Sequence, residues 1–369
     1  MERETAAESL VGTVTAVQAN YYWVKLSAAS DWAGAVLLCT RRARLKKTGQ
    51  QVMVGDRVVI EEPDWQGQRG AIAAILPRST TLDRPPVANA SQILLVFALA
   101  DPQPEPLQMS WFLVKAEAAG LRVAVALNKC DLVDPSVQTE WSDRLQTWGY
   151  APLWLSVYQG QIPTDLNLTL QQQTTIVCGP SGVGKSSLIN ALIPDLSLRV
   201  SAVSGKLGRG RHTTRHVELF ELPRGGLLAD TPGFNQPDID CGPEALENYF
   251  PEIRQRLKQQ RCRFSDCLHR DEPGCAVRGS WERYKHYLQL VEDLLCQQAA
   301  QLSDTDDTGV KYKVTTAGQR QAEPRLAAKK YRRISRRSRN QALQDLCQEI
   351  VDTGDNLEIL EGLSLDDLT

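Results

Sequence analysis

A glycine-rich stretch near the middle of the chain decides how its fold is interpreted: Thr174-Thr-Ile-Val-Cys-Gly-Pro-Ser-Gly-Val-Gly-Lys-Ser-Ser187. From Gly179 to Ser186 it matches the pattern G-x-x-x-x-G-K-[ST]. The apolar run 174–178 predicts a buried strand before the motif, and residues 186–192 predict a helix after it. Strand, loop and helix in this order are the context in which the pattern holds nucleotide phosphates. This disfavours the alternative of a glycine-rich turn without a ligand.

The parts of this loop have distinct roles toward a phosphate chain. The glycines let backbone N–H groups turn inward around phosphate oxygens, and the start of the helix adds partial positive charge. Lys185 is expected to reach the β- and γ-phosphates, and the Ser186 hydroxyl to ligate Mg²⁺. The predicted nucleotide-binding residues of the stretch are Gly179, Pro180, Ser181, Gly182, Val183, Gly184, Lys185, Ser186 and Ser187.

A second motif, Asn128-Lys-Cys-Asp131, indicates which base the nucleotide carries. It follows the apolar run 122–127, so the Asp131 carboxylate would lie at a strand end and accept hydrogen bonds from guanine N1–H and the 2-amino group. Adenine lacks this donor pair and would leave the carboxylate unpaired. The Lys129 stem can lie along the base, and Asn128 can tie this loop to the glycine-rich one. Cys130 is the fourth residue of the motif and is also predicted to bind the nucleotide. Together with the phosphate loop, the motif predicts GTP rather than ATP.

Two further segments extend the predicted site. Ser156 follows the apolar run 152–155 and is a candidate for a backbone contact to guanine O6, although Val157 stands where GTPases usually have Ala. Asp230-Thr-Pro-Gly233 follows the apolar run 226–229. Asp230 is expected to hold Mg²⁺ through water and the Gly233 N–H to sense the γ-phosphate, as in the D-x-x-G switch of GTPases.

The stretch 205–215 is rich in Gly and Arg and is predicted to be a mobile loop. It carries Thr213 and Thr214, one of which is expected to complete the Mg²⁺ shell, and Thr214 is preferred because an Arg follows it. His212 is the candidate for activating the attacking water, since Phe234 stands where Ras-like GTPases carry Gln. The alternative is slow hydrolysis in a protein that acts only as a switch.

The order of these motifs along the chain is permuted. GTPases normally run phosphate loop, switch threonine, D-x-x-G and N-K-x-D, whereas here 128–131 precedes 179–186 and 230–233 ends the domain. Because the termini of compact domains often lie close together, a circular permutation can keep the sheet while opening the chain elsewhere. A γ-phosphate-dependent movement at 230–233 could then be passed to the region that follows.

Short apolar runs predict the architecture around the motifs. Five of them within residues 11–75 favour a small closed barrel of the OB type, with an SH3-like barrel as the alternative. Pro77, Pro85 and Pro86 indicate a linker after it. From residue 91, apolar runs alternate with helix-capable segments such as 107–119, which predicts an α/β domain with a largely parallel sheet. The expected strands are 11–18, 21–26, 36–40, 57–62 and 70–75 in the barrel, and 93–98, 122–127, 152–155, 174–178, 216–222 and 226–229 in the α/β domain.

Four potential metal ligands follow the α/β domain: Cys262, Cys267, His269 and Cys275. Three thiolates and one imidazole are a set that Zn²⁺ takes in closed, structural sites, and the alternative is a group of free thiols. A helix is predicted after the cluster, and one packing face of it would carry Tyr284, Leu288, Val291 and Leu295. Residues 302–323 are polar and are predicted to be a linker.

Composition excludes several classes of protein. Of 369 residues, 42% are hydrophobic and 23% charged, which rules out a wholly disordered chain. The longest apolar run, 93–100, is too short for a bilayer, and the first ten residues are not expected to be a secretory signal. Nine cysteines, an odd number, argue against a disulfide framework. The chain is expected to be soluble and cytoplasmic, with no membrane partner.

The net charge of −2 hides two basic clusters. One, Arg41-Arg-Ala-Arg-Leu-Lys-Lys47, lies between predicted barrel strands. The other, residues 325–339, holds eight basic residues and no acid, and precedes an acidic stretch, 340–369. A solvated charged face is the simplest explanation of one such cluster. Two of them beside a barrel and a zinc module favour RNA, because arginine binds phosphates by charge and by bidentate hydrogen bonds.

Over about residues 11–301, the chain resembles the ribosome small-subunit-dependent GTPase family of the RsgA type. The resemblance rests on the barrel and on the combined order of 128–131, 179–187, 210–214, 230–234 and the cysteine cluster. It implies hydrolysis of GTP to GDP and phosphate stimulated by the 30S subunit, a role in late maturation of that subunit, and contacts of barrel and zinc domain with 16S rRNA. It also favours His212 as catalytic. Arg215 replaces a third threonine often seen there, and the extension from about residue 302 inherits no role.

The sequence therefore predicts a multidomain, permuted GTPase that works on the 30S subunit as a monomer. Its expected domains are an OB-like barrel (1–78), an α/β P-loop GTPase domain (79–237) and a mainly helical zinc-binding domain (238–301), followed by a linker, basic arm and acidic tail (302–369). One structural Zn²⁺ and Mg²⁺ with GTP are the expected cofactors. The alternatives are a GTP-switched RNA-binding zinc protein with negligible catalysis, and a permuted GTPase of large-subunit assembly.

Overall fold

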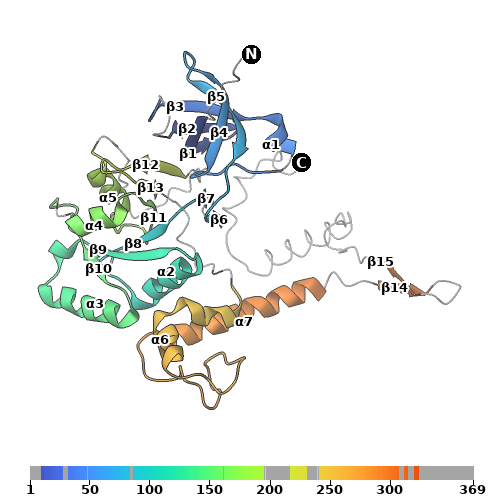
Figure 1. Ribbon diagram of the computed structural model, residues 1–369. Helices are drawn as coiled ribbons and strands as arrows, with labels where there is room; N and C mark the ends of the chain where they lie inside the picture. The colour runs from blue at the N-terminus through green and yellow to red at the C-terminus, as the bar shows by residue number, and fades with distance from the viewer. Residues whose placement is uncertain are drawn as a thin grey trace, which may run out of the picture. The chain divides into compact units, whose positions relative to one another are not determined.

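The computed structural model describes residues 10–27, 32–47, 49–83, 86–160, 162–194, 196, 217–230, 239, 241–306, 311–314 and 320–323. Contacts divide the chain into two compact units, residues 1–295 and 296–369. Figure 1 labels the helices and strands of both.

Five strands in the first unit close into a barrel. They are β1 (Leu10–Gln18), β2 (Tyr21–Leu26), β3 (Val36–Arg41), β4 (Arg57–Asp64) and β5 (Arg69–Ile75). The order is β1-β2-β3-β5-β4, β4 returns to β1, and β3 pairs with β5 in parallel. Helix α1 (Ala43–Lys47) lies between β3 and β4. Alternate residues such as Tyr22, Val24 and Leu26 fill the interior, since successive side chains of a strand face opposite sides. The predicted closed barrel is confirmed.

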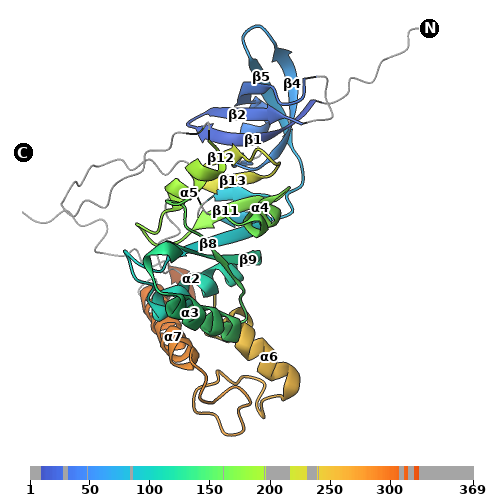
Figure 2. The same cartoon turned by 90° about the vertical axis from the view of Figure 1, so that its left-hand side faces the viewer.

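The central part is a mostly parallel sheet (Figure 2). Its strands are β8 (Gln92–Ala98), β9 (Arg122–Asn128), β10 (Pro152–Trp154), β11 (Thr174–Cys178), β12 (Glu218–Glu221) and β13 (Leu227–Asp230), in the order β10-β9-β8-β11-β13-β12. Only β12 among these six runs antiparallel to its sheet neighbour β13. The helices between the strands are α2 (Pro106–Ala118), η1 (Cys130–Leu132), α3 (Pro135–Trp148), α4 (Thr164–Leu170) and α5 (Lys185–Leu192).

Strand β8 shows why these strands appear in the sequence as short apolar runs. All seven of its residues are buried. Ile93, Leu95 and Phe97 pack in one cluster with α2 and α3, while Leu94, Val96 and Ala98 pack in another with α4 and α5. A parallel strand covered on both faces needs apolar residues at consecutive positions, not at alternate ones.

The proline-containing segment after the barrel, predicted to be a linker, is held against the barrel. It forms a two-stranded ladder, β6 (Thr81–Asp83) with β7 (Pro86–Ala88). Arg78 donates to both carboxylate oxygens of the buried Asp56, at 2.7 and 2.9 Å. At Gly55 (φ 88°) an added Cβ would lie 2.0 Å from the Ala88 carbonyl oxygen, so the close approach requires glycine. Strand β1 also pairs with β12 at one position, Ala16 opposite Glu218.

The cysteine-bearing region is mainly helical, with η2 (Pro243–Tyr249), α6 (Pro251–Gln259) and α7 (Tyr284–Asp306). The buried stripe of α7 consists of Tyr287, Leu290, Val291 and Leu294. Of the predicted packing face, Val291 belongs to this stripe, whereas Tyr284, Leu288 and Leu295 flank it and are half-buried. The stripe is displaced because α7 packs against Phe250, which lies between η2 and α6, against Ile253 of α6 and against Val114 of α2.

Residues 302–323, predicted to be a linker, contain regular structure. Helix α7 continues to Asp306, and β14 (Lys311–Val314) pairs antiparallel with β15 (Arg320–Glu323). Tyr312 and Val314 are residue types that favour strands, which a reading based on overall polarity overlooks. Among the described residues, no helix combines the length and the apolar composition needed to span a membrane.

Candidate nucleotide site and metal centre

The glycine-rich loop lies between β11 and α5, as the sequence predicts. At two positions of the loop only glycine fits, because the backbone has a positive φ and a neighbouring atom lies too close for a Cβ. At Gly179 (φ 144°) an added Cβ would lie 2.0 Å from the Val96 carbonyl oxygen, and at Gly184 (φ 98°) it would lie 2.4 Å from Asn128 Nδ2. The loop therefore packs directly on β8 and on the residue that ends β9.

Lys185 is the first residue of α5, and its ammonium group turns back over the loop. Its Nζ donates to the carbonyl oxygens of Gly179, at 2.8 Å, and Pro180, at 2.6 Å. This places a positive charge above the loop, at the N-terminal end of α5. The first backbone N–H groups of a helix have no partner inside the helix and are available to a ligand. The arrangement suits an anionic phosphate chain.

Asn128 joins three loops at the carboxyl edge of the sheet. Its buried Nδ2 donates to the Val183 carbonyl oxygen of the glycine-rich loop, at 2.8 Å, and its Oδ1 accepts from the Val157 N–H, at 3.3 Å. The first of these ties is predicted from the sequence. The second also joins Asn128 to the segment after β10.

Asp131 is held by a residue for which the sequence analysis proposes a different role. Ser156, predicted as a backbone contact to the base, is fully buried, and its hydroxyl donates to Asp131 Oδ1 at 2.5 Å. The Cys130 N–H also donates to the Leu155 carbonyl oxygen, at 3.1 Å. A carboxylate has about four acceptor positions, so Asp131 keeps capacity for the two donors of a guanine edge.

Lys129 crosses toward the end of β8. Its backbone is left-handed (φ 62°), and its Nζ donates to the Asp101 carbonyl oxygen. Strand β8 lies between β9 and β11. The sheet continues from it to β9 and β10 on one side and to β11, β13 and β12 on the other. The crevice at the carboxyl ends of strands with this arrangement is where open α/β sheets bind ligands.

The magnesium and water-activating half of the predicted site is not part of the described structure. The segments 197–216 and 231–238, with His212, Thr213, Thr214 and Gly233, lie outside the described residues. Asp230 is described as the last residue of β13, where its backbone pairs with Val177 of β11. Its position is thus at the same sheet edge as the glycine-rich loop.

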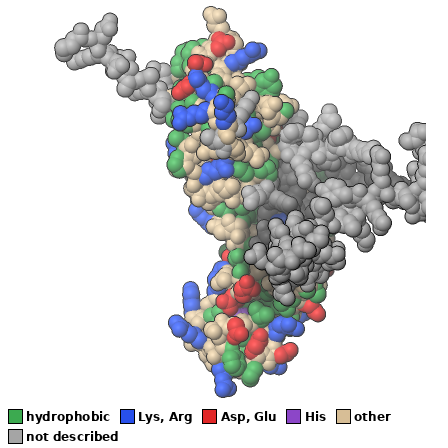
Figure 3. Space-filling view, turned by 90° about the vertical axis from the view of Figure 1, so that its right-hand side faces the viewer, with side chains coloured by type: hydrophobic (Ala, Val, Ile, Leu, Met, Phe, Trp, Pro, Cys, Tyr) green, Lys and Arg blue, Asp and Glu red, His purple; other side chains and the backbone are tan. Residues whose placement is uncertain are grey.

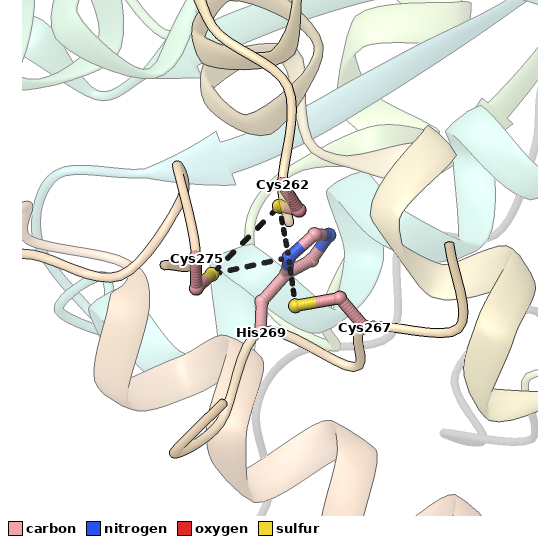
Figure 4. A group of neighbouring side chains, drawn as sticks. All are labelled: Cys262, Cys267, His269 and Cys275. Atoms are coloured by element: carbon pink, nitrogen blue, oxygen red, sulfur yellow. Dashed lines mark hydrogen bonds between the residues drawn. The ribbon is translucent and has the colours of Figure 1, made fainter. Parts of the chain in front are cut away.

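The four predicted metal ligands converge (Figure 4). Their ligand atoms all lie within 4.8 Å of one another. His269 Nδ1 lies 3.5, 3.4 and 3.4 Å from the sulfurs of Cys262, Cys267 and Cys275, and the sulfurs of Cys262 and Cys275 are 4.0 Å apart. A tetrahedral ion with metal–sulfur bonds of about 2.3 Å and a metal–nitrogen bond of about 2.0 Å needs separations of about 3.5 to 3.8 Å. The distances from His269 Nδ1 are close to these values and the sulfurs lie somewhat farther apart, so the four side chains could hold a metal ion.

A carboxylate outside the cluster orients the imidazole. His269 Nε2 lies 2.7 Å from Glu247 Oε2, so the proton belongs on Nε2 and the Nδ1 lone pair faces the three sulfurs. Burial, with the neighbouring thiols, raises the pKa of the Cys267 thiol to about 12. A metal ion bound beside this thiol would favour its ionised form. Glu247 lies 22 residues before His269 and belongs to no local motif, so its role cannot be recognised in the sequence.

Helix α7 fixes the loop that carries His269. The Tyr284 hydroxyl donates to the carbonyl oxygens of His269 and Arg270, at 2.9 and 3.0 Å, and the Tyr287 hydroxyl donates to that of Leu268, at 3.0 Å. Glu272 accepts from the backbone N–H groups of Leu268 and Arg270. The ligand loop is thus anchored to the same helix whose apolar stripe forms the core of this region.

Known proteins are similar to this chain over most of its length. The family model described as RsgA GTPase matches residues 75–240. A protein of Trichormus variabilis named small ribosomal subunit biogenesis GTPase RsgA is 61% identical over 361 residues, which cover 92% of this chain and 97% of that protein. The chain belongs to the RsgA GTPase family. A Synechocystis protein of the same name is 53% identical over 354 residues, 92% of this chain and 95% of that protein.

Two solved structures of this family share the fold. YjeQ from Thermotoga maritima is 32% identical, has a TM-score of 0.67, and the match covers 78% of this chain and 98% of YjeQ. YloQ, described as a circularly permuted GTPase, is 29% identical with a TM-score of 0.66, covering 80% of this chain and 99% of YloQ. The permuted GTPase fold predicted from the motif order is thereby confirmed.

Proposed function

We propose that this chain hydrolyses GTP to GDP and phosphate, binds the small ribosomal subunit and assists its late maturation, turning over faster when the subunit is present. The observation that carries the proposal is the tie through Asn128 between the phosphate loop and the loop that bears Asp131. The names of the RsgA relatives supply the biological process, small ribosomal subunit biogenesis.

In this proposal guanine lies against Asp131, which accepts from its N1–H and 2-amino groups, while the peptide after Ser156 faces O6. The phosphates lie in the loop 179–187, and Lys185 exchanges its two carbonyl acceptors for phosphate oxygens. Ser186 and Thr214 would hold Mg²⁺, with Asp230 acting through water. The ion would neutralise charge on the β- and γ-phosphates. His212 would orient or deprotonate the water that attacks the γ-phosphate, and Gly233 would sense that phosphate.

The metal of the cysteine cluster is proposed to be Zn²⁺, held by Cys262, Cys267, His269 and Cys275. Three thiolates and one imidazole leave no open position for substrate, so the ion would be structural. It would stiffen a loop that is rich in arginine: Arg261, Arg263, Arg270 and Arg278. A stiff basic loop suits the phosphate backbone of RNA.

The barrel is proposed to be a second contact with 16S rRNA. On its outer surface Tyr21 and Trp23 are 52% and 40% exposed, and Trp32 stacks on Trp65 with ring centroids 4.2 Å apart. Exposed aromatic rings accept unpaired bases by stacking, and an OB barrel binds nucleic acid on the face and loops where these rings lie. Figure 3 shows Lys and Arg side chains over the barrel and again over the cysteine-bearing region.

The chain would act as a monomer in the cytoplasm, with functional domains at 1–78, 79–237 and 238–301. The basic arm in 302–369 lies outside the described residues.

The test is GTP turnover measured in parallel with purified 30S, 50S and 70S particles and with no particle. The proposal predicts strong stimulation by 30S and little by 50S. Stimulation by 50S alone would indicate a large-subunit assembly factor. Turnover that stays negligible with every particle would indicate an RNA-binding protein that GTP only switches. Turnover of His212→Ala with 30S tests the water-activating role, because GTP affinity should stay near wild type while kcat falls.

A further inference from the structure

Two consecutive residues immediately before α7, Glu282 and Arg283, attach the cysteine-bearing region to the GTPase domain. Both carboxylate oxygens of Glu282 accept a hydrogen bond: Oε1 from Arg144 Nε at 2.7 Å, and Oε2 from Trp148 Nε1 at 3.0 Å. Arg144 and Trp148 lie one turn apart on α3, and Figure 2 shows α7 beside this helix. Because the two donors engage both oxygens of one carboxylate, they fix its direction as well as its distance.

The Arg283 side chain is fully buried where the two parts meet. Its Nη1 donates to both carboxylate oxygens of Glu252 in α6, at 3.2 and 3.1 Å, and its Nε donates to Ser110 Oγ of α2, at 3.1 Å. The guanidinium carbon lies 5.0 Å from the ring centroid of Trp148 and 4.4 Å from that of Phe250. One guanidinium group thus contacts α2 and α3 on one side and the cysteine-bearing region on the other.

The buried ion pair of Arg283 and Glu252 is an inefficient source of stability. Burial raises the pKa of the Glu252 carboxyl even though the nearby Arg283 charge lowers it. Apolar side chains of similar volume often replace a buried ion pair without loss of stability, whereas removal of one partner alone is strongly destabilising. Directed hydrogen bonds, in contrast, allow one arrangement of the two parts, while an apolar contact tolerates sliding. The pair is therefore better suited to fixing an orientation than to stabilising the fold.

The position of α7 determines where the metal-ligand loop lies, because Tyr284 and Tyr287 hold that loop by its backbone. We propose that Glu282 and Arg283 fix the cysteine-bearing region in one orientation on α2 and α3, so that it and the GTPase domain present one preformed surface to the small ribosomal subunit. They are positioning residues for 30S-stimulated hydrolysis. A partner of fixed shape that touches both parts binds more tightly when their relative position is set beforehand. The inference rests on the proposed function, which supplies the small subunit as partner.

The experiment measures basal and 30S-stimulated GTP turnover of full-length variants over a range of 30S concentrations. Glu282→Ala should raise the 30S concentration for half-maximal stimulation about tenfold and leave basal turnover unchanged. Arg144→Ala should act in the same direction, and the double variant should match Glu282→Ala alone, because both changes break the same contact. Glu292→Ala is the matched control: it removes an exposed acid of α7 that has no described ion pair, and it should change neither quantity.

The buried pair separates positioning from stability. Arg283→Met alone leaves Glu252 buried and unpaired and should lower the thermal unfolding midpoint. Arg283→Met together with Glu252→Met should restore the midpoint to near the wild-type value, while the 30S requirement stays raised. Hydrogen exchange of the free protein tests the attachment without ribosomes: amides of 110–118 and 284–294 should exchange faster in this double variant than in wild type.

A wild-type 30S requirement in the Arg283→Met, Glu252→Met variant would overturn the inference, and so would wild-type hydrogen exchange at α2 and α7 in that variant. Additive effects of Glu282→Ala and Arg144→Ala would also overturn it, because they would assign each side chain to its own contact with the particle. The proposed function fails separately, if 30S does not stimulate the wild-type protein. Hydrogen exchange of the free variants still decides in that case whether the pair fixes the attachment.

Discussion

The base-recognition loops (residues 128–131 and 155–157) and the cysteine cluster each bring together residues from distant positions in the chain, but different interactions hold them together. At the base-recognition loops, Asn128, Ser156 and the Cys130 N–H connect three strand ends through neutral groups and one carboxylate. At the cluster, three thiols and an imidazole face one another. Glu247 supports His269, and the N–H groups of Ala276 and Arg278 donate to the sulfurs of Cys262 and Cys275. The protein alone completes the first arrangement, whereas the Zn²⁺ proposed above would complete the second.

This difference has a physical consequence for each region. Loops held by their own hydrogen bonds have the binding conformation before a nucleotide arrives. Nucleotide binding therefore loses little conformational entropy of the protein. At the cluster, burial opposes ionisation of the Cys267 thiol, so the proposed metal ion would contribute to the stability of this region when it binds. Removing ligands should therefore affect the two regions very differently.

The largest effect is expected from removal of the metal. Cys267→Ser, or a strong chelator acting on the wild-type chain, should release one Zn²⁺ and unfold the loop 260–280, because structural zinc contributes on the order of 10 kcal/mol to small sites. Metal analysis combined with thermal unfolding measures this. Cys296→Ser, which alters an exposed cysteine outside the cluster, is the control and should keep both metal and stability.

GDP binding by the metal-free protein tests whether the base-recognition loops are independent of the cysteine cluster. GDP should still bind the metal-free protein, because no cluster residue contacts 128–131 or 179–187 in the described hydrogen bonds. Complete loss of GDP affinity on chelation, while the sheet remains folded by circular dichroism, would show that the two regions are not independent.

The next effect is a change of base preference. Asp131→Asn replaces two acceptor positions with an amide that donates beside the 2-amino group of guanine. We expect GTP affinity to fall by roughly a thousandfold, since hydrogen bonds to charged groups contribute about 2 kcal/mol each. XTP, which carries an oxygen in place of that amino group, should bind the variant better than GTP does. Competition binding with the two nucleotides tests this, and an unchanged preference for GTP would exclude Asp131 from base recognition.

A smaller effect is expected at the residue that connects the loops. Asn128→Ala removes a buried amide and leaves the Val183 carbonyl without that donor, which should cost about 3 kcal/mol of unfolding free energy. Urea denaturation of the nucleotide-free protein measures it. Asn248→Ala, which removes an exposed amide bonded to the Ala245 carbonyl at 3.3 Å, serves as the control and should cost well under 1 kcal/mol.

The smallest effect concerns the attachment of α7 to α2, where His286 Nδ1 lies 2.8 Å from Ser110 Oγ. Burial, with the charges of Arg283 and Lys285, lowers the pKa of His286 to about 4, while Glu282 opposes the shift. The unfolded histidine takes up a proton near pH 6.5 and the folded one does not, so this contribution to stability is complete above pH 6.5 and is lost as pH falls toward 4.

Between pH 7 and pH 5 the loss should be about 2 kcal/mol. His286→Gln, which keeps a hydrogen-bonding side chain that does not titrate, should remove that part of the pH dependence in urea unfolding. A variant with the same pH profile as wild type would assign the acid sensitivity to other groups.

The sequence predicts local elements well wherever one residue pattern determines them. Strands β2 and β11 have the predicted limits, because buried strands leave apolar runs bounded by turns. The convergence of the four candidate metal ligands and the Asn128 tie also follow from motif and spacing. In each case the residues that matter lie within one short segment or belong to a motif with a fixed chemical role.

Features that depend on which elements become neighbours are not visible in the sequence. The bond from Ser156 to Asp131 exists because β9 and β10 are adjacent parallel strands, and the support of His269 by Glu247 exists because η2 packs beside the cluster. The packing stripe of α7 is displaced for the same reason, since α2 covers part of it. Such contacts are determined by the tertiary arrangement rather than by a local pattern.

The most direct test of the account is a crystal structure of the full-length chain with a non-hydrolysable GTP analogue and Mg²⁺. The account predicts that the Asp131 carboxylate oxygens lie about 2.9 Å from guanine N1 and from the 2-amino nitrogen, while Lys185 contacts the β- and γ-phosphates. An analogue bound with its base away from Asp131, or with its phosphates outside the loop 179–187, would contradict it.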